Sequence, residues 1–92
     1  MKLKLRSSDI QHRHDITLPG AWTGETIDVA LEGGLRGNLE TIMQTDANTW
    51  HLRWLCEESS LNGRTFELAR MISTIHGPHQ QPDWNCRLLL AD

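Results

Sequence analysis

Histidine and cysteine are the residue types of this 92-residue chain that could most readily do chemistry. His12 and His14 are two positions apart, so a strand would place both on one side, where they could share a metal ion. His76 and His79, with Cys86 beyond them, form a second possible group of ligands. Neither group has the close C-x-x-C or H-E-x-x-H spacing that is typical of zinc sites. We therefore predict no cofactor, and a metal-binding or metal-stabilised protein that uses these histidines is an alternative.

Nucleophilic catalysis would need a thiol or hydroxyl beside a base. Cys56 follows His51 by five residues in a predicted strand, so the two side chains would point to opposite faces. Glu57 and Glu58 are adjacent, just before a predicted helix, which is typical of a solvated helix end rather than of an acid and base pair. No glycine-rich phosphate-binding motif precedes a helix. The sequence therefore predicts a protein that is not an enzyme.

The composition indicates one compact domain over residues 1–92. With 38% hydrophobic and 23% charged residues, the chain is too apolar to be disordered, and its net charge of −3 argues against nucleic-acid binding. Lys2, Lys4 and Arg6 would place three cations on one strand face, as a charged edge strand or as a basic docking strip. The longest apolar run, Leu88 to Ala91, is too short to insert into a membrane.

Cysteine usage and the N-terminal residues bear on the compartment. Two cysteines, Cys56 and Cys86, do not make a disulfide framework, and the basic N-terminus has no apolar segment of a signal peptide. These features predict a cytoplasmic protein with reduced, buried thiols.

Hydrophobic alternation predicts the strands that would position the functional residues. The first two cover Met1–Arg6 and His14–Leu18, and a third, Glu25–Glu32, turns at Gly33-Gly34 into a fourth. The fourth strand returns over Leu35–Met43, with three residues on one face, namely Leu39, Thr41 and Met43, and with a possible bulge at Gly37.

The fifth predicted strand has two distinct faces. Trp50, Leu52 and Trp54 share the face that should pack against the core. The opposite face carries the candidate partner-binding residues, which are His51, Arg53 and Leu55. Leu55 is an apolar residue among polar ones there, although partial cover by other strands is an equal alternative.

A helix is predicted after this strand, starting near Asn62 and ending at Gly77-Pro78. Its apolar stripe has a 4-3-4-3 spacing, formed by Leu61, Thr65, Leu68, Ile72 and Ile75. A last strand has Trp84, Cys86, Leu88 and Leu90 on one face. The predicted fold class is α+β, an antiparallel meander of about five to six strands with one amphipathic helix packed across one face.

Four segments together resemble a known family. They are Leu35-Arg36-Gly37-Asn38-Leu39-Glu40, Asn48-Thr49-Trp50-His51-Leu52-Arg53, the predicted helix over Leu68–Ile75, and the strand over Trp84–Leu90. This order resembles the C-terminal substrate-specificity-switch domain of type III secretion needle-length and flagellar hook-length control proteins. The chain lacks the long disordered ruler region of that family and has extra strands at its start. The resemblance implies a non-enzymatic domain that docks on the cytoplasmic export gate.

The leading functional prediction is therefore a non-enzymatic protein-binding module, with the type III secretion switch as its most specific form. Its partner would be another protein, and the resemblance implies a component of the export gate. A further alternative is a bacterial or phage accessory or immunity protein that acts as an inhibitor. The sequence does not separate that alternative from the first.

Overall fold

The computed structural model describes residues 2–71 and 83–91, which form one seven-stranded sheet and a single turn of 3₁₀ helix, η1 (Asp9–Gln11). The strands in chain order are β1 (Lys2–Leu5), β2 (His14–Pro19), β3 (Ile27–Leu31), β4 (Arg36–Asp46), β5 (Thr49–Leu55), β6 (Thr65–Arg70) and β7 (Asp83–Leu90). All of them belong to the same sheet, so the described residues form one structural unit.

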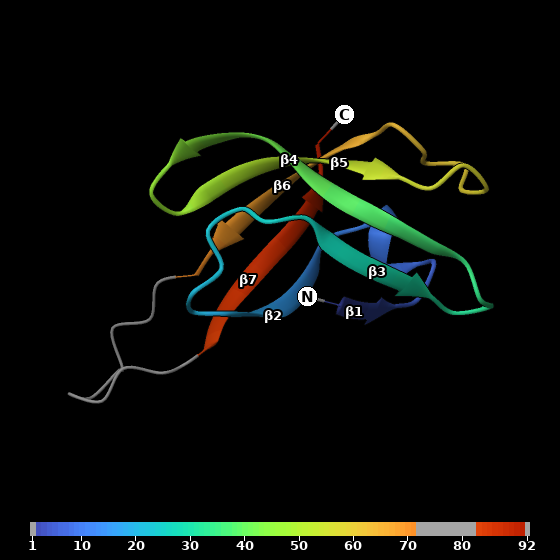
Figure 1. Cartoon of the computed structure of the whole chain (residues 1–92), viewed down its shortest axis with the longest axis horizontal. Helices are drawn as coiled ribbons and strands as arrows, with labels where there is room; N and C mark the ends of the chain where they lie inside the picture. Colours follow the sequence, from blue (N-terminus) through green and yellow to red (C-terminus); the bar gives the residue numbers. More distant parts are fainter. Residues whose placement is uncertain (1, 72–82, 92) are drawn as a thin grey trace.

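The strand order across the sheet is β1-β3-β4-β5-β6-β7-β2. Neighbouring strands are antiparallel except for β1 and β3, which are parallel. The sheet curls, so that β4 and β5 lie above β7 and β2 in Figure 1. One face therefore lines the inside of the curl, and the other forms the outer surface.

The predicted α+β fold is wrong, because residues 65–70 form a strand where the helix was expected. Phe66 and Leu68 are buried, and they alternate with Thr65 and Glu67, so a period of two describes this segment better than the helical stripe did. The helical pattern left out Phe66, which is almost fully buried. The expected helical positions Ile72, Ile75, Gly77 and Pro78 lie outside the described residues.

The segment expected to begin the helix instead forms the turn between β5 and β6. The Asn62 side-chain oxygen accepts a hydrogen bond from the Cys56 backbone N–H at 2.8 Å, and the Gly63 N–H donates to the Trp54 carbonyl at 2.7 Å. Asn62 is thus a turn residue rather than a helix cap. The additional strand gives the sheet seven strands instead of five or six, and the parallel pair means that it is not a simple meander.

The predicted faces of the third and fifth strands are confirmed. Ile27, Val29 and Leu31 are buried on β3, and on β5 the three inward residues, Trp50, Leu52 and Trp54, are at most 2% exposed. The physical reason for their burial differs from the expected one. No helix covers them in the described part of the chain, and the curl lets the inner faces of the strands pack on one another.

Gly37 allows the largest core residue to approach the backbone of β4. A Cβ built on Gly37 would lie 2.6 Å from Cη2 of Trp54 and 2.6 Å from the carbonyl oxygen of Leu55. Trp54 itself is 0% exposed. Gly37 therefore leaves space for an indole, and the irregularities of β4 lie further along the strand.

Arg70 closes one end of the core by stacking between aromatic rings. Its guanidinium carbon is 4.9 Å from the ring centroid of Trp50 and 5.0 Å from that of Trp84. Its Nη2 donates to the carbonyl oxygen of Trp22, whose ring contacts Trp50 edge-on at a centroid distance of 4.8 Å. These contacts give a cation an aromatic environment, in which no carboxylate of residues 2–71 and 83–91 pairs with it.

Candidate functional site

The three predicted partner-binding residues lie on the outer face of β5, as expected from their alternation with the buried tryptophans. Arg53 is exposed, whereas His51 and Leu55 are half-buried. His51 Nε2 lies 3.7 Å from a carboxylate oxygen of Glu67 on β6. Arg53 is in register with Glu40 on β4, and Leu55 with Asn38. The outer face is therefore chemically mixed around these residues, and their role in binding stays a prediction.

Large exposed apolar side chains beside His51 were missed in the sequence. Ile42 and Met43 on β4 are 47% and 52% exposed, and Leu89 on β7 is 42% exposed. Register pairs Met43 with His51, His51 with Glu67, and Glu67 with Leu89, so these four residues form one row across four strands. We call them, together with Ile42, the apolar row.

A β-bulge explains why the predicted face of Met43 is wrong. Thr41 pairs with Leu52 and Met43 pairs with His51, so one extra residue, Ile42, is inserted in β4. The bulge breaks the alternation that would have placed Met43 on the same face as Leu39. The sequence did contain a signal: two consecutive apolar residues in a strand cannot both face the core without such an irregularity.

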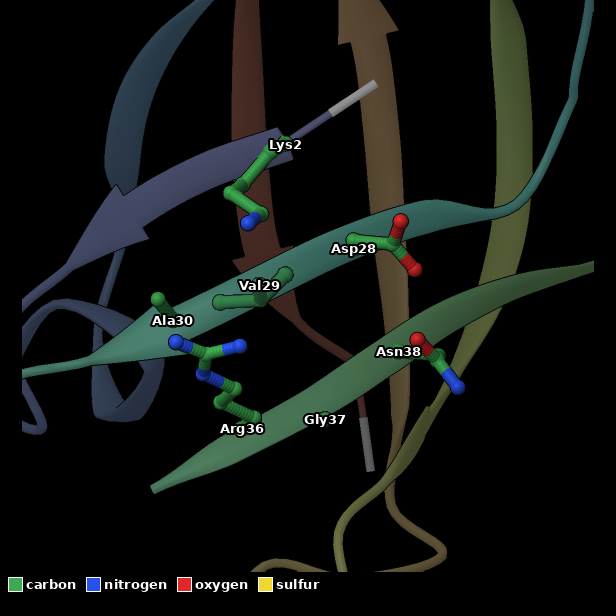
Figure 2. Close-up of a pocket in the computed structure, with 7 residues that line it drawn as sticks. All are labelled: Lys2, Asp28, Val29, Ala30, Arg36, Gly37 and Asn38. Carbon is green, nitrogen blue, oxygen red and sulfur yellow. The ribbon is translucent and has the colours of Figure 1, made fainter. Parts of the chain in front are cut away.

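A second feature of the outer face is a hollow of about 340 Å³ between β1, β3 and β4 (Figure 2). Its lining residues are Lys2, Asp28, Val29, Ala30, Arg36, Gly37 and Asn38. Figure 2 shows that Lys2 and Arg36 extend from the two flanking strands toward β3. Lys4 borders the same stretch of β3, because it is in register with Ala30, which is in turn in register with Arg36.

The predicted strip of Lys2, Lys4 and Arg6 therefore loses Arg6 and gains Arg36. Arg6 follows the end of β1, where its Nη2 lies 3.1 Å from Oδ1 of Asp9 and its backbone N–H donates to Oδ2 of the same carboxylate. These hydrogen bonds, first from the side chain and then from the backbone, lower the pKa of Asp9. Lys2 and Lys4 remain on the outer face, and Arg36 of β4 lies across β3 from them.

The histidines do not form a metal site in the described part of the chain. His12 ends η1, and His14 Nδ1 lies 3.7 Å from Asp9, which Arg6 already contacts. No three of the His, Cys, Asp and Glu side chains within residues 2–71 and 83–91 are arranged to hold a metal ion. The other candidates, His76 and His79, lie outside the described residues.

Both cysteines are free and buried. Cys56 is on the side of the tryptophans, whereas His51 faces outward, so the thiol and the imidazole are not placed to act together. Burial raises the pKa of the Cys86 thiol, which reduces its thiolate fraction and its nucleophilicity. Neither thiol therefore has the surroundings of an activated nucleophile.

Comparison with known proteins identifies no relative: no family model, curated protein or solved structure matches this chain. Among the described residues, no helix is long and apolar enough to span a membrane.

Proposed function

We propose that this protein is a non-enzymatic, cytoplasmic protein-binding module that contacts its partner through the apolar row and the neighbouring Arg53 and Leu55. The observation that carries the proposal is the row itself, in which exposed Met43 and Leu89 flank His51 and Glu67, whose Nε2 and carboxylate oxygen lie 3.7 Å apart. Apolar side chains gathered on an exposed face and bordered by polar groups are typical of protein contact surfaces. Two free thiols agree with a reducing compartment.

The most specific form of the proposal is a type III secretion substrate-specificity switch that docks on the export gate. Two of the segments that resemble that family, residues 35–40 and 48–53, lie in and next to the adjacent strands β4 and β5. The third segment gives no support, because Leu68–Arg70 belongs to a strand rather than to a helix. The proposed docking surface lies on the outer face of the same two strands and continues over β6 and β7.

The test is direct binding of the purified protein to the cytoplasmic domain of an export-gate component, measured by calorimetry. Met43→Glu places a charge in the apolar row and should weaken binding by about tenfold or more, because a buried contact would be replaced by an unpaired charge. Gln44→Glu is the matched control, since Gln44 is exposed on the same strand and in register with Trp50 instead of His51.

Photo-crosslinking extends the test to a partner of another kind. A photoreactive amino acid at position 43 should crosslink to one protein that the same group at position 44 does not capture, and that protein should then bind in purified form. Equal crosslinking from both positions, or purified binding that Met43→Glu leaves unchanged, would contradict the proposed surface.

A further inference from the structure

The hollow between β1, β3 and β4 gathers cations that the rest of the molecule does not neutralise. Lys2 and Arg36 line it, and Lys4 stands two residues beyond Lys2, at the next exposed position of β1. Within residues 2–71 and 83–91, none of these three side chains takes part in an ion pair or a side-chain hydrogen bond. This sets them apart from Arg6 and Arg87, which pair with Asp9 and Asp15. The chain has more carboxylates than cations, with a net charge of −3, yet within the described residues none of the carboxylates forms an ion pair with these three cations.

The floor of the hollow leaves room between the charged groups. Ala30 lies between Lys4 and Arg36 in the cross-strand register, and its methyl group is the smallest side chain that a non-glycine residue can offer. Figure 2 shows the Lys2 ammonium and the Arg36 guanidinium on either side of the Val29-Ala30 segment. A small ligand resting on Ala30 could therefore reach cations from two strands.

The lining of the hollow contains one carboxylate, Asp28, which accepts a hydrogen bond from the neighbouring Asn38. The Asn38 amide nitrogen donates to Asp28 Oδ1 at 2.8 Å and to the Gly37 carbonyl oxygen at 3.0 Å, in the amide orientation that satisfies both groups. Figure 2 shows Asp28 and Asn38 at the end of the hollow away from Arg36. Lys2 is in register with Asp28, whereas Lys4 and Arg36 are both in register with Ala30, two residues further along β3 from this carboxylate.

We propose that Lys2, Lys4 and Arg36 bind a compact oxyanion, that is, a phosphate or carboxylate group. The planar guanidinium of Arg36 can donate two parallel hydrogen bonds to such a group, and the lysines add point charges. The dimensions and the neighbouring Asp28 favour one oxyanion over a nucleic-acid backbone, which would need a longer cationic track. The group could come from a free small anion or from an acidic side chain of a protein. The site stands independently of the proposed apolar row.

Two probes distinguish these sources in NMR titrations of the full chain at low ionic strength. Inorganic phosphate represents the free anion, and a blocked peptide of alternating Asp and Ala represents a protein segment. We expect at least one probe to shift the amide resonances of residues 28–30 and 36–38, with a Kd of about 1 mM or tighter. Arg36→Gln should weaken that binding by about tenfold, because the paired hydrogen bonds to the oxyanion are lost.

Arg13→Gln is the matched control, since it removes an exposed arginine from the segment between η1 and β2, outside both the hollow and the apolar row, and should leave the shifts unchanged. Both variants are first compared with the wild type by thermal melting, and Lys2→Gln with Lys4→Gln provides a second variant if Arg36→Gln unfolds. Shifts with phosphate alone assign a free anion, and shifts with the peptide alone assign an acidic protein segment. Absence of shifts with both probes, or equal weakening in Arg13→Gln, would overturn the site without bearing on the apolar row.

Discussion

Both faces of the sheet carry large apolar side chains and arginines, but the two faces place them in different surroundings. On the inner face, Trp54 fits against Gly37, and Arg70 is stacked between two indoles. On the outer face, Met43 and Leu89 are exposed, and Arg36 has no ion-pair partner among the residues described. Apolar and cationic groups of these kinds are packed together on the inner face and stay available on the outer face. This contrast separates residues that maintain the fold from residues that are available to bind a partner. Substitutions on the inner face should therefore lower the free energy of unfolding more than substitutions on the outer face.

The largest effect is expected for Trp54→Ala. Trp54 is 0% exposed, so the substitution leaves a large cavity and should lower the free energy of unfolding by about 3–5 kcal/mol. Trp54→Phe should cost less, because the ring remains and the indole Nε1, which has no hydrogen-bond partner in the described chain, is removed. Urea denaturation followed by circular dichroism measures both changes. A loss below 1 kcal/mol for Trp54→Ala would mean that Trp54 is not part of the core.

An intermediate effect is expected for Arg70→Ala. The substitution removes two ring contacts and the hydrogen bond to the Trp22 carbonyl, so the free energy of unfolding should fall by about 1–3 kcal/mol. Arg53→Ala is the control on the outer face and should change it by less than about 0.5 kcal/mol. Both changes are measured by urea denaturation. Equal losses of the free energy of unfolding in Arg70→Ala and Arg53→Ala would show that arginines on the two faces do not differ in their contribution to stability.

A small effect on stability is expected for Met43→Gln and Leu89→Gln. Both side chains are about half exposed, so each substitution should change the free energy of unfolding by less than about 0.5 kcal/mol. Solubility should rise, because each substitution reduces exposed apolar surface. Thermal melting and light scattering test the two effects, and a large loss of stability would show that the apolar row belongs to the core.

The smallest effect concerns Asp9, whose pKa is lowered by its hydrogen bonds with Arg6. A lowered pKa means that the pair stabilises the fold above the usual pKa of aspartate, and that this contribution disappears as the pH falls through the lowered value. Because Arg6 is exposed, solvent screens the pair and the change should be slight. NMR titration of the Asp9 carboxyl should show its pKa rising toward the ordinary value in Arg6→Gln. An unchanged titration would exclude this pair as the cause.

The sequence was sufficient for elements whose two faces differ clearly. The alternation on β3 and β5 predicted the buried residues, and Gly33-Gly34 predicted a turn in which both glycines have a φ of 94°. The prediction failed at Thr65–Arg70. The apolar residues there fit the spacing of three or four that indicates a helix, and they also fit the alternation that indicates a strand. Only the pairing of β6 with both β5 and β7 decides between these periods, and that pairing involves residues distant in sequence.

The candidate sites were predicted only in part, for the same reason. His51, Arg53 and Leu55 could be assigned to one face because β5 is regular. Met43 was misplaced because the bulge in β4 is a property of the paired strands rather than of its own residues. Arg36 could not be joined to Lys2 and Lys4 from sequence, since the parallel pairing of β1 with β3 brings together segments separated by a strand and two loops.

The pairing of β2 with β7 has a consequence for synthesis of the chain. Ile16 is in register with Cys86, so the second strand finds its neighbour only after about 70 further residues have been translated. Contacts between such distant residues carry a high loop-closure cost and slow folding. While β7 is still inside the ribosomal tunnel, β2 lacks the strand that it pairs with. We therefore expect the nascent chain to remain sensitive to protease until β7 has left the tunnel, and to acquire resistance only afterwards.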